Sequence, residues 1–246
     1  MNEFLTLLSA TPIFAILGFG FLLGLKHATE ADHLAAISTM VSERRSMWSS
    51  ALVGGLWGLG HTISLFAAGV FVLVLNFQIS ELIERRLEMS VGIMLTLLGL
   101  NVFRKLINGG HLHFHAHDHG TRAHAHPHIH ELSEAEHDAT HHGFEFNPRA
   151  LTIGMVHGLA GSAALMLLVI PTIESRTVGM LYVAVFGIGS IGGMMLMSFL
   201  VGLPFHFTAM RFSRFNQVLQ VCAGAVSIGL GLWIVYEKGF SEGLFV

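Results

Sequence analysis

Charged residues are scarce in this sequence, and their scarcity excludes an ordinary soluble domain. Asp, Glu, Lys and Arg make up 12% of the 246 residues, whereas hydrophobic residues make up 52%. The mean hydropathy is +0.64. Soluble globular chains carry about 25% charged residues, because water must solvate their surface. We therefore expect lipid to cover much of the surface of this protein.

Cysteines and basic clusters are lacking as well. Cys222 is the single cysteine, so the chain forms no internal disulfide and has no CxxC motif. The formal net charge is −3 and the basic residues are scattered, which excludes nucleic acid as a partner. Neither the phosphate-binding pattern GxxxxGK[ST] nor the zinc-protease pattern HExxH occurs.

Long apolar runs predict six membrane-spanning helices. A bilayer core of about 30 Å requires about 20 apolar residues of helix. Such runs lie at residues 13–37, 51–75, 89–107, 150–173, 178–203 and 215–236. A cleaved signal peptide is not expected, because residues 1–12 contain no Lys or Arg. The predicted fold class is all-α, a polytopic membrane protein with six transmembrane helices.

The distribution of basic residues predicts the orientation in the membrane. With six spans, the two tails and the second and fourth connections share one side and carry four Lys or Arg residues. The other three connections carry nine, counting Lys26 of the first run with them. Because Lys and Arg accumulate on the cytoplasmic side, we expect a multi-pass protein of the cell membrane with both termini outside.

Three segments in the first half of the chain match segments in the second half. GIMLTLLGLNVF from Gly92 matches GAVSIGLGLWIV from Gly224, at a shift of 132 residues. GLWGLGHTISLF from Gly55 matches GIGSIGGMMLMS from Gly187 at the same shift. GLKH, which ends at His27, matches GMVH, which ends at His157, at a shift of 130. Units of three spans cross the membrane in opposite senses, as in the inverted repeats of secondary transporters. The predicted domains are residues 1–107, a connecting loop at 108–148, and 149–246.

Ionisable residues gather in the first predicted span. His27, Glu30, Asp32 and His33 lie within seven residues. Such groups are costly to place inside a membrane, so their presence there indicates a function. On a regular helix His27, Glu30 and His33 share one face, and Asp32 points elsewhere. Either Asp32 orients a histidine of a neighbouring helix, or the helix is unwound there.

Two further histidines lie at the predicted depth of the membrane, one in the second span and one in the fourth. Neutral imidazole binds Ni, Cu, Zn and Fe ions, and carboxylates balance the charge of a divalent ion. The sequence therefore predicts a metal site inside the membrane. Its core residues are His27, Asp32, His33 and His61, with Glu30 and His157 as neighbours.

The segment from His27 to His33 fits the HxxxxDH signature of the nickel/cobalt transporter family, and LGHT at residues 59–62 looks like the family's LGH[ST] motif. This resemblance implies uptake or efflux of Ni²⁺ or Co²⁺, with the histidines and aspartate of the first span essential and His61 contributing. Glu30 stands where an aspartate is common in the family.

The second half departs from the larger members of that family, because HGLAGS at residues 157–162 contains no acid. The chain is thus most similar to the shorter branch, which includes urease-associated nickel permeases and six-span nickel/cobalt efflux proteins. His157 and Ser162 are assigned only by their place in the repeat.

The connection at 108–148 contains 12 of the 17 histidines. Alternating histidines define no single tetrahedral site, and this composition builds no core. We predict a disordered cytoplasmic loop that exchanges metal ions, and its deletion is expected to change capacity or regulation more than the transport step.

The predicted function is secondary transport of Ni²⁺, with Co²⁺ as a second cargo and uptake favoured over efflux. The predicted partners are the metal ion, the bilayer and a nickel-enzyme maturation system; no catalytic cofactor is expected. A metal-binding accessory protein is one alternative. A membrane di-iron enzyme is another, since HDATHH at 137–142 resembles one histidine box of such enzymes, although these enzymes need several boxes.

Overall fold

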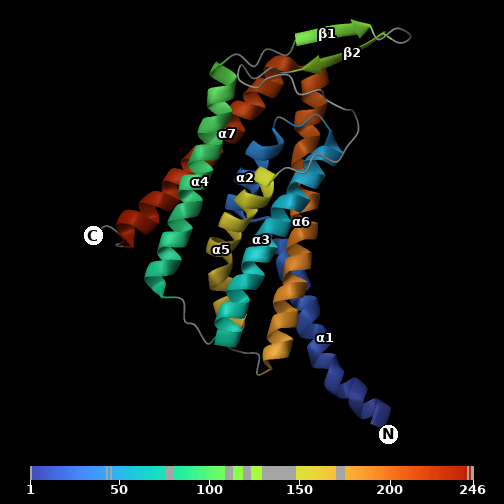
Figure 1. The fold of residues 1–246 in the computed structure, drawn as a ribbon, viewed down its shortest axis with the longest axis vertical. Coiled ribbons are helices and arrows are strands. Elements are labelled where there is room, and N and C mark those ends of the chain that lie inside the picture. The colour runs from blue at the N-terminus through green and yellow to red at the C-terminus, as the bar shows by residue number, and fades with distance from the viewer. Residues whose placement is uncertain are drawn as a thin grey trace.

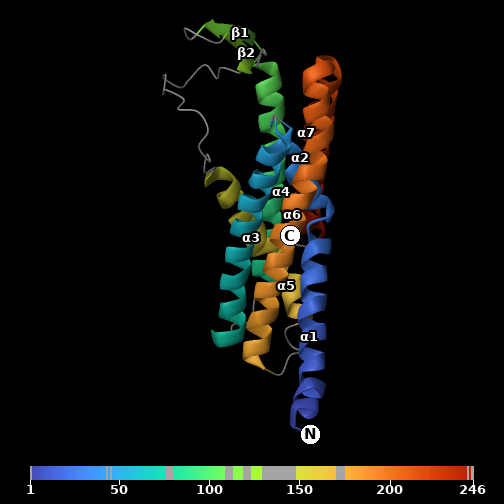
Figure 2. The same ribbon diagram turned by 90° about the vertical axis from the view of Figure 1, so that its right-hand side faces the viewer.

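The computed structural model describes residues 2–42, 44, 46–75, 80–108, 113–118, 123–128, 148–169, 175–242 and 244. Long helices lie side by side in an elongated bundle, and a short hairpin lies at the end of the bundle opposite the N terminus (Figure 1, Figure 2). The elements are α1 (Asn2–His27), α2 (Ala31–Val41), α3 (Met47–Leu75), α4 (Glu81–Ile107), β1 (His113–Asp118), β2 (Ala123–His128), α5 (Pro148–Val169), α6 (Arg176–Arg211), α7 (Ser213–Tyr236) and a π-helical turn at Glu237–Ser241.

Several helices are long and apolar enough to cross a membrane, as the sequence predicts. Four qualify on their own, within α3, α4, α6 and the segment Ser213–Ser241. The pair Ile13–His27 and Ala31–Val41 qualifies together as a fifth, bent span. The remaining predicted span, 150–173, corresponds to α5, which the structure describes as far as Val169. The chain is thus a helical membrane protein.

The first predicted span is not one regular helix. Helix α1 ends at His27 and α2 begins at Ala31, with a bend of 55° between them. The hydroxyl and amide of Thr29 both donate to the Lys26 carbonyl, at 2.6 and 2.8 Å, and Glu30 has an extended backbone. These bonds satisfy the end of α1 locally, so the helix ends there. Regular helical spacing therefore does not predict which way the residues beyond His27 face.

Helix α3 packs against both α5 and α6. Glycines allow the close approach to α5. A Cβ atom on Gly60 would overlap the Leu151 carbonyl, and one on Gly154 would overlap the Trp57 carbonyl. Without a hydrophobic drive between helices in lipid, such close backbone packing supplies much of the association energy. Helix α1 packs on α6, and α4 packs on α7.

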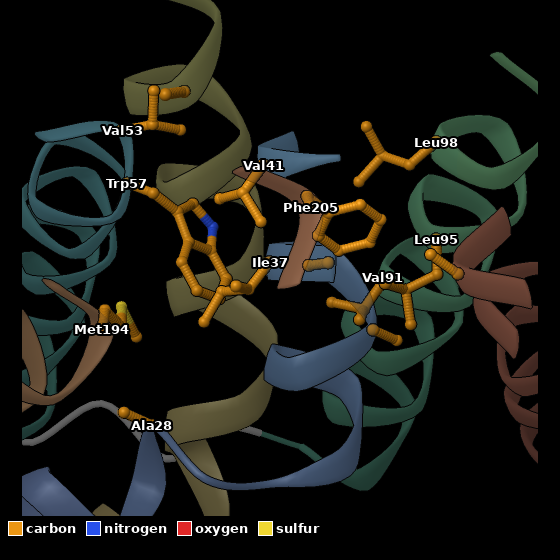
Figure 3. Close-up of a cluster of buried hydrophobic side chains, with 14 of the residues drawn as sticks. Ala28, Ile37, Val41, Val53, Trp57, Val91, Leu95, Leu98, Met194 and Phe205 are labelled. Atoms are coloured by element: carbon orange, nitrogen blue, oxygen red, sulfur yellow. The ribbon is translucent and has the colours of Figure 1, made fainter. Parts of the chain in front are cut away.

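The largest apolar cluster lies where α2 meets its neighbours. Trp57, Ile37 and Val41 are fully buried in it, together with Leu95 of α4 (Figure 3). Many large apolar side chains instead point outward, including Leu97 of α4, which is 60% exposed. Outward-facing apolar side chains are expected where lipid is the solvent.

Two antiparallel strands lie within the segment predicted to be a disordered loop. In their register His113 pairs with His128 and His117 pairs with His124. These twelve residues therefore have regular structure where the composition predicts none, because alternating residues are compatible with a strand. Most other residues of the 108–148 segment lie outside the described part of the chain, so the prediction of a separate loop domain is untested there.

A buried amide connects the helices near the turn between α6 and α7. Asn216 Nδ2 donates to the Phe205 carbonyl and to Thr208 Oγ1, at 3.0 and 2.9 Å. Asn216→Ala removes both of these buried hydrogen bonds, and we expect it to lower the free energy of unfolding by about 1–3 kcal/mol. Thermal unfolding in detergent, followed by circular dichroism, measures this loss. Gln217→Ala, at the exposed neighbouring position, is the control and should change stability by less than about 0.5 kcal/mol; equal shifts in both variants would contradict the assigned role.

Candidate metal centre

Four histidines from four helices converge inside the bundle. His27 is the last residue of α1, His33 lies in the first turn of α2, His61 lies in α3 and His157 in α5. Each is at most 1% exposed. The His33 ring lies in the middle, with its centroid 4.3 Å from that of His27, 4.2 Å from that of His157 and 5.4 Å from that of His61.

Asp32 bridges two of these histidines. Its Oδ1 accepts a hydrogen bond from the backbone amide of His33 and lies 3.0 Å from His33 Nδ1. Its Oδ2 lies 3.0 Å from Nε2 of His157 on the neighbouring helix α5. The sequence left two alternatives for Asp32, and the structure combines them. The helix is interrupted before Asp32, and Asp32 contacts a histidine of another helix.

The carboxylate of Glu30 lies at the edge of this group. Its Oε2 is 2.9 Å from His27 Nδ1, and its side chain is 42% exposed. The break between α1 and α2 turns Glu30 back toward the end of α1. Glu30 therefore contributes negative charge at the exposed edge of the cluster, whereas Asp32 contributes it closer to the centre.

Several ring nitrogens of the cluster have no hydrogen-bond partner within the described part of the chain. These atoms are His27 Nε2, His33 Nε2, His61 Nδ1, His61 Nε2 and His157 Nδ1. Buried polar atoms are nearly always paired, since leaving them unpaired in an apolar interior costs about 1–3 kcal/mol each. Each of the four imidazoles thus has an unpaired ring nitrogen, and a metal cation would satisfy the lone pairs of such nitrogens.

Two sets of side chains hold their ligand atoms close enough for one ion. In the first set, His27, His33 and His61 each offer an atom within 4.8 Å of the others. In the second, Asp32, His33 and His157 do the same. Four nitrogens around a first-row ion at about 2.1 Å would be about 3.4 Å apart. Small side-chain movements are therefore enough to close either set around an ion.

Aromatic side chains that were not predicted from the sequence cover the cluster. The Trp57 ring lies 5.3 Å from that of His33 and 5.4 Å from that of His157, and Phe186 lies 5.6 Å from His27. Trp57 precedes His61 by one helical turn, and this spacing is the signal that could have identified it. No comparable signal in the sequence identifies Phe186, which comes from α6.

All six residues predicted for the site lie in or beside this cluster: His27, Glu30, Asp32, His33, His61 and His157. Their role as metal ligands is still a prediction. The side chain of Ser162 lies outside the described residues. His206, the other histidine outside the 108–148 segment, lies in α6 beside Phe207, with a ring-centroid distance of 5.8 Å.

Comparison with known proteins finds relatives over nearly the whole chain. The chain is 36% identical over 235 residues to the urease accessory protein UreH of Bacillus sp. (strain TB-90), covering 95% of this chain and 96% of that protein. It is 26% identical over 228 residues to Chloroplast protein FOR GROWTH AND FERTILITY 2 of Arabidopsis thaliana, covering 92% of this chain and 57% of the relative.

One shorter match is to a protein that is named as a transporter. Over 71 residues the chain is 35% identical to the High-affinity nickel transport protein of Cupriavidus necator, covering 28% of this chain and 20% of that protein. No protein-family model matches the chain, and no solved structure does.

Proposed function

Since the chain belongs to the family of the urease accessory protein UreH, we propose that it is a secondary transporter that carries Ni²⁺ across the cell membrane through the histidine cluster. Co²⁺ is a second cargo of matching chemistry, because imidazole and carboxylate ligands bind both ions. Uptake is the proposed direction, on the similarity to a urease accessory protein, and efflux is the alternative. The proposed partner inside the cell is a system that supplies nickel to a metalloenzyme.

The observation that carries this proposal is the convergence of four buried imidazoles inside an apolar bundle, two of them in contact with Asp32. A purely structural cluster would pair its nitrogens with donors and acceptors of the protein. Here each of the four imidazoles has a ring nitrogen without a hydrogen-bond partner among the described residues, and a divalent cation is a partner that fits such nitrogens. Two of the relatives are named as an accessory protein and a transport protein, which agrees with the prediction that the chain is not an enzyme.

We also propose that the chain consists of two inverted repeats, in which α1 and α2 correspond to α5, α3 to α6, and α4 to α7. Reciprocal contacts between α4 and α7 support this. A Cβ on Gly92 would meet the Gly231 carbonyl, and a Cβ on Gly224 would meet the Gly99 carbonyl. A shift of 132 residues, the one found in the sequence, converts the first contact into the second.

The contact between α1 and α6 and the contact between α3 and α5 are also related by exchanging the two proposed repeats, at sequence shifts slightly different from 132. Gly189 of α6 packs on the Phe21 carbonyl of α1, and Gly60 of α3 packs on the Leu151 carbonyl of α5. The shift is 130 between Phe21 and Leu151, as the sequence predicts, but 129 between Gly60 and Gly189. The packing therefore supports a register for α3 and α6 three residues away from the match found at 132.

The proposed orientation follows from the basic residues. The hairpin and the turn between α6 and α7 lie at one end of the bundle, and the N terminus lies at the other (Figure 1). Arg104, Lys105 and Arg214 belong to the end with the hairpin. The proposal places that end in the cytoplasm.

Flux of radioactive nickel into proteoliposomes tests the proposal. The full chain is expected to accumulate ⁶³Ni²⁺, and His27→Ala or His61→Ala should reduce the rate by at least about tenfold, because each removes one imidazole of the cluster. His206→Ala is the matched control and should transport normally.

Two results of this assay would contradict the proposal. Unchanged flux in both site variants would show that the cluster is not part of the transport pathway. Binding of nickel without flux in the unmodified chain would instead support a metal-binding accessory protein, which the name of the Bacillus relative also allows. In intact cells, higher metal tolerance rather than higher metal content would reverse the direction to efflux.

A further inference from the structure

The histidine cluster divides into two overlapping sets of ligands. The imidazole set is His27, His33 and His61. The acidic set is Asp32, His33 and His157. No set among the described residues that meets the same distance limit contains both His27 and His157. One ion therefore does not reach every ligand of the cluster at once in this arrangement.

His33 belongs to both sets but has one nitrogen to offer. Its Nδ1 lies 3.0 Å from Asp32 Oδ1, and its Nε2 has no hydrogen-bond partner in the described structure. The hydrogen bond to the carboxylate places the proton on Nδ1 and leaves the lone pair on Nε2. Because one lone pair binds one ion, the two sets cannot be filled at the same time through His33.

The two sets also differ in charge and in origin. The imidazole set is neutral, whereas the acidic set includes one carboxylate and lowers the charge of a bound divalent ion to +1. His27 comes from α1 and His157 from α5, and the two proposed repeats exchange these helices. His33 lies almost midway, with ring distances of 4.3 and 4.2 Å to the two histidines.

We infer that the transported cation occupies two alternating positions, one in the imidazole set and one in the acidic set, and passes between them while bound to His33. This inference rests on the proposed function and adds the route within the site. A ligand common to both positions lets the ion exchange its other ligands one at a time, so it is never without protein ligands in the apolar interior.

Nickel binding to single and double variants of the full chain in detergent tests the inference. With two alternating positions, the loss of one leaves the other. His61→Ala and His157→Ala should each still bind one Ni²⁺ per chain, with Kd raised by no more than about tenfold. His33→Ala and the double variant His61→Ala/His157→Ala damage both positions and should raise Kd by more than about a hundredfold. Flux should fall in all four variants.

The ligands of the bound metal provide a second readout. X-ray absorption of bound nickel should show carboxylate oxygen in His61→Ala and imidazole ligands without carboxylate in His157→Ala. His61→Asn and His157→Asn, which keep a polar side chain, replace any alanine variant that does not fold, as judged by gel filtration. His206→Ala is the control for both readouts.

A single position with all ligands around one ion predicts a different pattern. Each single variant would then weaken binding as much as His33→Ala does, and the double variant would weaken it further. That pattern, with normal binding and flux in the unmodified chain, would overturn the two positions but leave transport intact. No nickel binding by the unmodified chain would overturn the proposed function itself.

Discussion

Asp32→Asn is expected to reduce nickel flux by about 10- to 100-fold. Both carboxylate oxygens of Asp32 face imidazole nitrogens, at 3.0 Å from His33 Nδ1 and 3.0 Å from His157 Nε2. An asparagine presents a donor to one of these nitrogens, so that ring must move its proton to the other nitrogen. The lone pair that faced the metal is then lost, together with the negative charge. Initial rates of ⁶³Ni²⁺ flux measure the effect.

Glu30→Gln is the matched control for that variant. Glu30 is half-exposed and contacts one imidazole, His27 Nδ1, which the amide oxygen of a glutamine can still contact. Exposed ion pairs contribute about 0–1 kcal/mol, so flux should fall by about fivefold at most. If both variants lose flux equally, negative charge near the cluster matters and the bridging geometry of Asp32 does not.

Gly154→Leu is expected to damage both the fold and the site. A Cβ at this position would overlap the Trp57 carbonyl of α3, and it would also lie 3.0 Å from the His61 amide nitrogen. A leucine therefore forces α3 and α5 apart, and overpacking of this kind costs about 1–3 kcal/mol or more. His61 and His157, whose ring centroids are 6.1 Å apart, separate with their helices. We expect a lower melting temperature in detergent and loss of high-affinity nickel binding.

Gly18→Leu tests whether the effect depends on position. A Cβ on Gly18 meets no atom within 4 Å, and this glycine lies on the exposed side of α1. Its replacement adds the same side chain at a site that faces lipid, so stability and nickel binding should change little. A Gly154 variant as stable and as active as the Gly18 variant would show that α3 and α5 need no close contact.

The sequence was informative where lipid restricts the possibilities. Apolar length predicts helices because a bilayer leaves backbone groups no partner except each other. Ionisable residues within the predicted spans point to the candidate site, because such groups are costly in lipid, and the six residues predicted from the sequence lie in or beside the cluster, from His27 to His157. The resemblance to nickel transporters agrees with the relatives found by comparison.

Other features depend on tertiary contacts that the sequence does not display. The end of α1 depends on which carbonyl Thr29 contacts, and a continuous helix has the same composition. The contribution of Phe186 depends on the register of α6 against α1. Glycines repeat at similar spacings in all these helices, so backbone packing selects among registers that are nearly equivalent in sequence.

The break between α1 and α2 also places two helix ends beside the histidines. The carboxyl end of α1, at His27, carries the partial negative charge of its aligned peptide dipoles. The amino end of α2 carries the opposite charge, and Asp32 in its first turn offsets it. A divalent cation between these ends meets a negative helix terminus on one side and a carboxylate on the other. An uninterrupted first helix would present no such terminus in the middle of the bundle.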